Sequence, residues 1–504
     1  MAYSSLILFL TFIFVLMYQE FSGKYSRLTT IFSIISTSIV FSIPIFYIIY
    51  AINFDTKITR DIIYALFQTN LQESLEFSET YLSEYQIIFI IFLISTTGVL
   101  LLKQENKEST KIEKSLLMFL LIYIFSNLIA YRHDIHLLIY LKNGIQEYKK
   151  ELQLFKKEQE KMKNGYIQFY ANKTNTGETY IVVIGESLNK YHMGIYGYSR
   201  QTTPLLKKLS QTYLKFEHSY SNHTHTMPVL SLSLTEANQL NKKIFYNSLS
   251  IIDILNKANF QTYWISNQNM YGEWDNLVSI IAHQADHLTS INHSRGKTTR
   301  TQKFDSEVLK HIKKILKQND HSNNKVIFVH LMGSHGDYCQ RYPKKEFSKF
   351  NGIVNRSINC YDNSVLYNDF VVSNIMDILK QDSGIRGFVY MSDHADDVDR
   401  GLGHNSSKFT YDMTQIPLIM WFSDTFKNKY SLSYSNLLEN KNKLFSNDFF
   451  YDTLLGIMQV QTQHYNSSYD LSSNQYKLED NKAFTLHGKK RYIDKNNTFY
   501  LPKH

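Results

Sequence analysis

Two short apolar runs rich in β-branched residues stop directly before acidic or imidazole side chains. The run 182–184 precedes Glu186, and the run 389–391 precedes Asp393 and His394. Uninterrupted apolar runs of this kind predict buried strands of a parallel sheet. Ligands of open α/β sheets bind at the carboxyl ends of the strands. We therefore expect the two strand ends to converge on one metal ion, and carboxylate with imidazole favours zinc over manganese.

The same hydrophobic pattern continues through the C-terminal two thirds of the chain as alternating strand and helix. Strands are predicted at 180–184, 263–266, 326–330, 387–391 and 418–422. Helices are predicted between them, for example at 248–258, 307–317 and 364–380. This alternation predicts an α/β domain with a predominantly parallel sheet and helices on both faces. The segment 466–476, rich in Ser, Asn and Tyr, is predicted to be an exposed loop.

The N-terminal part has a different pattern. Long apolar stretches occupy residues 3–18, 30–52, 86–102 and 115–131. The stretch 30–52 is long enough to span a membrane as a helix. The other three are close to the lower limit of roughly 17 residues for such a helix. Residues 1–132 are therefore predicted to form an α-helical transmembrane bundle of about four helices.

Positive charge in the short loops predicts the orientation of this bundle. Loops 19–29 and 103–114 are rich in Lys and Arg, whereas loop 53–85 carries few basic residues against several acids. Basic loops stay on the cytoplasmic side. The last helix then leaves the cytoplasm, and everything after residue 132 lies outside it.

Residues 133–170 are predicted to form an amphipathic linker helix. Apolar side chains recur at Leu141, Ile145, Tyr148, Leu152 and Phe155, and lysines occupy the other face. The helix either lies on the membrane surface or docks on the soluble domain, with its lysines merely solvated. The catalytic domain is predicted to follow at 171–504.

Charge and cysteine content narrow the function classes. The net charge is +9, but no nucleic-acid-binding motif is present. The lysines gather in membrane-proximal loops and the linker, which favours a membrane surface over nucleic acid as the partner. The two cysteines, Cys339 and Cys360, are either buried free thiols or a disulfide, and a location outside the cytoplasm favours the disulfide.

A threonine at a predicted helix start is the candidate nucleophile. Thr226 lies in the segment 221–228, just before a helical pattern. The positive end of a helix dipole and a divalent cation would both lower the pKa of its hydroxyl. The alternative is that Thr226 only caps the helix. His223 and His225 could themselves bind metal, because they alternate on an extended segment.

Ordered motifs across residues 178–460 resemble the phosphoethanolamine transferases of the alkaline phosphatase/sulfatase superfamily. They are VVIGESLNKYHMGIYGYSRQTTPLL, SNHTHTMPVL, HLMGSHGDY, INCYDNSVLYNDF, MSDHADD and FSNDFFYDTLLGIM. The resemblance implies an alkaline phosphatase-like fold and a Zn²⁺ site. It implies metal ligands at Glu186, Thr226, Asp393 and His394, with Thr226 as nucleophile and His335 and His404 near the transferred phosphate.

The resemblance further implies a function and a location. Phosphoethanolamine would pass from phosphatidylethanolamine through Thr226 to a lipopolysaccharide or lipooligosaccharide acceptor. The enzyme would be a monomeric, multi-pass protein of the bacterial inner membrane with a periplasmic catalytic domain. Family members that modify lipid A usually carry Ser-Asp-His-Gly-Glu where this chain has SDHAD. This departure, with the stretch YNSLSIIDILNKANFQTYWISNQNMYGEWDN, favours core heptose over lipid A as the acceptor.

Three other functions are weighed. A sulfatase would need a Cys or Ser followed by Pro and Arg at fixed spacing, and Thr226-Met227-Pro228 has no matching Arg. A glycerol-phosphate transferase of the lipoteichoic acid synthase type would use the same scaffold and a Thr nucleophile. A catalytically dead, membrane-anchored binding protein would not need the whole set of ligands.

Overall fold

The computed structural model describes residues 85, 86, 88, 136–163, 168–268, 277–292, 303–318, 322–352, 355–380 and 382–492. The chain divides into two compact units, Met1–Tyr148 and Lys149–His504. No helix within these described ranges combines the length and apolarity that a membrane span requires. The four predicted membrane helices lie almost wholly outside these ranges.

A seven-stranded sheet forms the centre of the second unit. Its strands are β2 (Thr179–Gly185), β3 (Leu214–Phe216), β5 (Phe260–Ser266), β6 (His287–Ser290), β7 (Asn324–His330), β8 (Ile385–Ser392) and β9 (Leu418–Phe422). They lie in the order β3-β9-β8-β2-β7-β5-β6. All five predicted strands are present, and each lies within or coincides with an observed one.

The sheet is mixed, which corrects one detail of the prediction. Neighbouring strands from β8 to β6 are parallel, but β9 runs antiparallel to both β8 and β3. A parallel connection needs a crossover, usually a helix. The segment between β8 and β9 contains only the short 3₁₀ turns Ser406–Lys408 and Tyr411–Thr414. Without a crossover helix, β9 pairs with β8 in the opposite direction.

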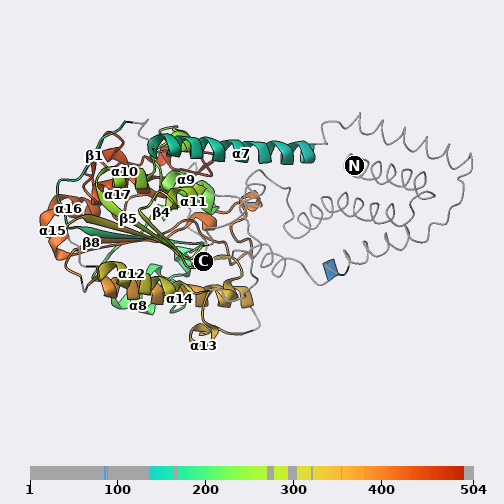
Figure 1. Cartoon of the computed structure of the whole chain (residues 1–504). Coiled ribbons are helices and arrows are strands. Elements are labelled where there is room, and N and C mark those ends of the chain that lie inside the picture. Colours follow the sequence, from blue (N-terminus) through green and yellow to red (C-terminus); the bar gives the residue numbers. More distant parts are fainter. Residues whose placement is uncertain are drawn as a thin grey trace, which may run out of the picture. The chain divides into compact units, whose positions relative to one another are not determined.

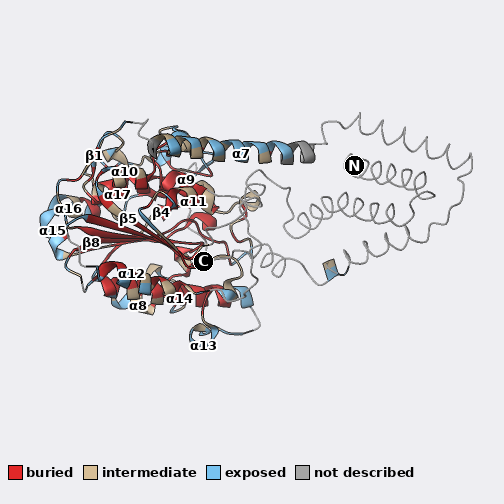
Figure 2. Ribbon diagram, in the orientation of Figure 1, coloured by how far each residue is buried: buried red, intermediate tan, exposed pale blue. Residues whose placement is uncertain are grey.

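Helices cover both faces of the sheet, as predicted (Figure 1). Alternate residues of β2 belong to different cores: Val182 and Ile184 on one face, Ile181 and Val183 on the other. The first face is covered by α9 (Thr226–Ser233), α10 (Ile251–Lys257), α11 (Leu277–Ala282) and α17 (Phe450–Ile457). The second is covered by α8 (Pro204–Lys208), α12 (Val308–Leu316) and α14 (Arg356–Leu379). Figure 2 shows the resulting buried layer along the central strands.

Smaller elements complete this unit. The remaining helices are α13 (Lys344–Phe347), α15 (Asp424–Lys429) and α16 (Ser431–Asn440). Short strand pairs join β1 (Ala171–Asn172) to β11 (Gln461–Thr462), β4 (Ser219–Tyr220) to β10 (Phe445–Ser446), and β12 (Phe484–Thr485) to β13 (Lys490–Arg491). The segment 466–476 is not simply an exposed loop, because the Leu471 and Tyr476 side chains are buried in the core.

Helix α7 (His136–Lys163) lies within the linker helix predicted at 133–170. The Phe155 side chain is fully buried, and its ring centroid lies 6.4 Å from that of Phe245. Gln159 accepts a hydrogen bond from Gln284. The part of α7 after residue 148 therefore docks on the catalytic unit, as one of the two interpretations predicted. Contact of its lysine-bearing face with a membrane stays a prediction.

A buried cluster of charged side chains lies directly before the first residue of β2. The Glu178 carboxylate is fully buried and lies 2.8 Å from the ammonium groups of both Lys173 and Lys429. The hydroxyls of Tyr180 and Tyr430 also donate to it at 2.8 Å. Burial alone would raise the pKa of Glu178, but the Lys173 charge and these donors lower it to about 2.

We expect Glu178→Gln to lower the free energy of unfolding at pH 7 by about 3–5 kcal/mol, because it leaves the Lys173 ammonium buried without a counterion. The pKa of Glu178 falls from its ordinary 4.5 to about 2 on folding, so the wild-type contribution is complete above pH 4.5. It declines as the pH falls through about 2. Denaturant unfolding of the detergent-solubilised chain at pH 7 and pH 3 measures this.

The control is Glu479→Gln, whose carboxylate contacts Lys477 and Lys482 at the protein surface. That variant should unfold like the wild type. Equal loss of stability in the two variants would show that the buried cluster has no special role.

Candidate active site

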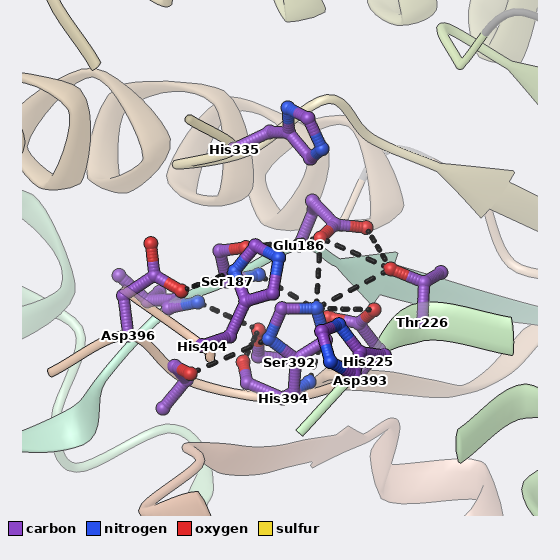
Figure 3. Close-up of polar contacts among 12 residues, drawn as sticks. Glu186, Ser187, His225, Thr226, His335, Ser392, Asp393, His394, Asp396 and His404 are labelled. Atoms are coloured by element: carbon purple, nitrogen blue, oxygen red, sulfur yellow. Dashed lines mark hydrogen bonds and ion pairs between the residues drawn. The ribbon is translucent and has the colours of Figure 1, made fainter. Parts of the chain in front are cut away.

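The site lies where two neighbouring parallel strands end. β2 and β8 pair in a register that places Gly185 opposite Ser392. Glu186 follows the first strand, and Asp393 with His394 follows the second. One ligand atom from each of these three side chains lies within 4.8 Å of the others. The structure thus brings together the three side chains that the strand pattern predicted to converge (Figure 3).

Thr226 faces this cluster from the first turn of α9. Its hydroxyl lies 3.1 Å from Glu186 Oε2 and 3.3 Å from His394 Nε2. The preceding residue, His225, occupies the N-cap position without making a side-chain capping bond. Thr226 is therefore not the N-cap residue that the alternative interpretation required. Its hydroxyl points at the carboxylate and imidazole, as Figure 3 shows.

Only one of the two oxygens of the Asp393 carboxylate accepts hydrogen bonds. Oδ1 accepts the backbone N–H groups of His394 at 2.7 Å and Ser187 at 3.2 Å. Oδ2 is buried, makes no hydrogen bond, and lies 3.5 Å from His394 Nε2. A buried carboxylate oxygen without a donor is costly unless a cation or a polar group meets it. The residues present therefore fit a metal ion bound between Glu186, Asp393 and His394.

The electrostatics of the site point the same way. Burial raises the pKa of Glu186 to about 7. Burial, and then the neighbouring Glu186 charge, raise the pKa of Asp393 to about 7 as well. Burial also lowers the pKa of His394, which favours its neutral form. Two buried carboxylates repel each other, and a bound divalent cation would offset this repulsion.

Close packing holds Glu186 in place. Ser187 adopts a left-handed backbone conformation with φ 56°, and its hydroxyl donates to Glu186 Oε1 at 3.0 Å. Gln268 donates to Glu186 Oε2 at 3.3 Å and to the Leu331 carbonyl at 2.9 Å. The backbone of Gly333 passes so close that a Cβ there would lie 2.6 Å from the Glu186 carbonyl oxygen.

The histidines that the resemblance implied surround the same cluster. The ring centroids of His404 and His394 are 4.7 Å apart, and those of His404 and His335 are 6.4 Å apart. Burial, and then the Arg341 charge, lower the pKa of His335 to about 3. Burial lowers the pKa of His404, but the charge of Asp396, the hydrogen bond to it and the charges of Glu186 and Asp393 together outweigh burial, so the net direction is upward.

His223 and His225 do not join a candidate metal cluster. Over the part of the chain that the structure describes, groups of three possible ligands are Glu186–Asp393–His394 and His394–Asp396–His404. The His225 ring lies 5.1 Å from that of His404, so it lines the site without completing either group.

The predicted disulfide is confirmed. Cys339 and Cys360 are bridged. The bond ties the short turn Tyr338–Gln340, just after His335, to the buried helix α14. It therefore anchors a loop that borders the site.

Sequence reasoning missed four side chains that support the site. Ser187 and Gln268 donate hydrogen bonds to the Glu186 carboxylate. Asp396 hydrogen-bonds to His404, and Tyr338 donates to Asp396. Ser187 directly follows the predicted ligand Glu186, and Asp396 lies two residues after the predicted ligand His394. Their positions in the sequence alone could therefore have indicated them. Gln268 and Tyr338 carry no such signal, because tertiary packing brings them to the site.

Comparison with known proteins identifies the family. The family model described as Sulfatase matches residues 178–460, and the chain belongs to this family. The phosphoethanolamine transferase EptC of Escherichia coli strain K12 is 27% identical over 448 residues, which cover 79% of this chain and 74% of that protein.

Solved structures agree with this assignment. The zinc complex of the C-terminal periplasmic domain of EptC from Escherichia coli is 27% identical with a TM-score of 0.58, covering 64% of this chain and 93% of that one. The integral membrane lipooligosaccharide phosphoethanolamine transferase A (EptA) from Neisseria meningitidis has a TM-score of 0.62 at 18% identity. It covers 93% of this chain and 96% of that chain, and it supports the fold.

We expect Gly333→Ala to displace Glu186 and weaken the site. Gly333 has φ 54°, and the added Cβ would meet the Glu186 backbone rather than a flexible side chain. The strain should cost about 1–3 kcal/mol of stability and should also lower zinc affinity. Thermal unfolding and zinc titration of the purified chain measure the two effects.

Gly336→Ala is the matched control in the same loop, since a Cβ there has no atom within 4 Å. It should change stability by less than about 0.5 kcal/mol. Identical behaviour of the two alanine variants would contradict the close-packing argument.

Proposed function

We propose that this protein transfers phosphoethanolamine from phosphatidylethanolamine to a lipopolysaccharide or lipooligosaccharide acceptor through a covalent intermediate on Thr226. One observation carries the proposal: the Thr226 hydroxyl sits at a helix start, 3.1 Å from Glu186 Oε2 and 3.3 Å from His394 Nε2. The similarity to phosphoethanolamine transferase EptC, over most of both chains, supports this reaction.

Glu186, Thr226, Asp393 and His394 are the proposed ligands of a Zn²⁺ ion. The Asp393 Oδ2 atom, which makes no hydrogen bond, and the mixed oxygen and nitrogen donor set support zinc. The solved zinc complex of the EptC periplasmic domain supports the same metal. When bound, the metal would favour the ionised threonine and neutralise charge on the phosphoryl oxygens.

In the first step, the Thr226 oxygen attacks the phosphorus of phosphatidylethanolamine. The bond between phosphorus and the glycerol oxygen breaks, and phosphoethanolamine stays on Thr226. The hydroxyl proton of Thr226 passes to water, because Glu186, which the hydroxyl contacts, would stay ionised as a metal ligand. His404 gives a proton to the leaving diacylglycerol oxygen, and the backbone N–H groups at the start of α9 bind phosphoryl oxygens.

In the second step, an acceptor hydroxyl loses its proton to His404 and attacks the same phosphorus. The bond to Thr226 breaks, and the threonine oxygen recovers a proton from water. We assign to His335, whose ring centroid lies 6.4 Å from that of His404, a contact with the transferred phosphate. The two steps return every group to its starting state.

The proposed location follows from the lipid donor. The catalytic domain, 171–504, would lie in the periplasm, joined through the linker 133–170 to a transmembrane domain at 1–132 in the bacterial inner membrane. The similarity in fold to the periplasmic EptC domain, at 27% identity and a TM-score of 0.58, supports this location. Core heptose is the favoured acceptor over lipid A. Comparing glycolipid masses from cells with and without this protein tests that choice.

We expect Thr226→Ala to keep the fold and bound zinc but to transfer no phosphoethanolamine, because it removes the attacking oxygen. Thr226→Ser retains a hydroxyl and should retain part of the activity. With phosphatidylethanolamine vesicles and no acceptor, mass spectrometry should find phosphoethanolamine on the wild-type peptide that contains Thr226.

Thr224→Ala is the matched control. Thr224 lies two residues away, and its buried hydroxyl has no hydrogen-bond partner in the structure. This variant should release diacylglycerol at nearly the wild-type rate. Wild-type labelling by the Thr226→Ala chain would place the nucleophile elsewhere.

We expect Asp393→Asn to weaken zinc binding by more than about 100-fold and to abolish transfer, since loss of a ligand exceeds the 10–100-fold cost of losing a supporting residue. His335→Ala and His404→Ala should lower activity while most zinc stays bound. Competition with a zinc chelator measures the affinities.

The control for the metal is Asp369→Asn. Asp369 is also buried, but its oxygens accept the backbone N–H groups of Leu205 and Leu206. Its replacement should leave zinc affinity unchanged. Full activity and zinc content in Asp393→Asn would reject the proposed site.

A further inference from the structure

A chain of hydrogen bonds connects Tyr338 to His404. The Tyr338 hydroxyl donates to Asp396 Oδ2 at 2.5 Å. The other oxygen of the same carboxylate, Oδ1, lies 2.8 Å from His404 Nδ1. Each carboxylate oxygen therefore has its own partner, and Asp396 itself is almost fully buried. The third residue of the chain, His404, borders the proposed reaction centre.

Tyr338 is itself held on two sides. Its ring packs edge-on against the Tyr361 ring, with centroids 4.9 Å apart. The next residue, Cys339, is bridged to Cys360 on the same helix, α14. Tyr361 in turn donates to the Ser187 carbonyl at 2.6 Å. Tyr338 thus presents its hydroxyl from a loop that is fastened to the core.

We propose that Tyr338 is a positioning residue that acts through Asp396 to fix the orientation and tautomer of His404. This inference rests on the proposed transferase function. In this role, Tyr338 does not contact the substrate. Its role is to determine which nitrogen of His404 faces the reacting phosphoryl group.

The chemistry of imidazole explains why such a support is needed. A neutral histidine has one N–H and one bare nitrogen, and the hydrogen bond made by one nitrogen determines the role of the other. With Nδ1–H donated to Asp396, Nε2 is the nitrogen left to exchange protons with the lipid leaving group and the acceptor. The Tyr338 hydrogen bond prevents the Asp396 carboxylate from rotating away from Nδ1.

A purely structural role for Tyr338 makes a different prediction. If its ring only fills space beside Tyr361, loss of the hydroxyl should hardly matter, because phenylalanine keeps the ring. If the hydroxyl serves a second purpose elsewhere, its loss should slow the reaction by the same factor with or without His404. Dependence on His404 separates the proposal from both of these alternatives.

The experiment measures the single-turnover release of diacylglycerol from phosphatidylethanolamine vesicles by the full zinc-loaded chain. Tyr338→Phe should slow this step about 10–100-fold, the usual cost of losing a residue that orients a functional histidine. Zinc content and melting temperature should stay at wild-type values. In a His404→Ala background, the same Tyr338→Phe change should have less than a twofold effect.

Tyr342→Phe is the matched control. Tyr342 lies in the same loop region and is buried, but its hydroxyl meets Asn363 at 3.2 Å instead of Asp396. It should react within twofold of wild type. If His404→Ala leaves no measurable rate, the Asp396→Asn background serves instead, and Tyr338→Phe should again add less than twofold.

Two results would overturn the inference. One is a change of less than twofold on Tyr338→Phe alone. The other is the same slowing in the presence and absence of the His404 imidazole, as independent effects would give. Either result leaves the proposed function standing if wild-type transfer still requires Thr226. Persistent transfer by Thr226→Ala would instead remove the proposed function itself.

Discussion

The parallel pairing of β2 with β8 is the constraint on which the rest of the site depends. Because Gly185 lies opposite Ser392, the next residue of each strand leaves the sheet at the same level. Glu186 and Asp393 therefore emerge side by side, and His394 follows. A slip by one residue would turn every side chain of a strand to the other face of the sheet. Burial of every residue of β2 resists such a slip.

This arrangement carries an electrostatic cost. Two carboxylates and an imidazole lie buried within 4.8 Å of one another, and their pKa values are displaced from the ordinary range. At the opposite end of β2, the buried Glu178 is surrounded by cationic and hydroxyl partners. The same strand is thus preceded by a buried carboxylate with cationic partners and followed by one that a bound cation would stabilise. Displaced pKa values of this kind gather at functional sites.

Much of the fold follows from local pattern. Apolar runs predicted five of the seven strands of the sheet, since a strand buried on both faces must be apolar throughout. Helix α10 begins directly after its N-cap residue, Ser250, which forms a capping box with Asp253. The direction of β9 was not predicted, because its apolar run resembles those of the parallel strands, and only the lack of a crossover helix between β8 and β9 distinguishes it. The burial of Leu471 and Tyr476 in a polar segment likewise depends on distant partners.

The sequence by itself determined which side chains end the strands and which threonine begins α9. These features are local, so the residues that carry the proposed chemistry could be named before the structure was known. Tertiary structure alone decided how those residues are supported. Gln268 and Tyr338 reach the site from segments 82 and 58 residues away from the carboxylates that they bind. Only the packing of the chain brings such distant groups within hydrogen-bonding distance, and no local pattern records it.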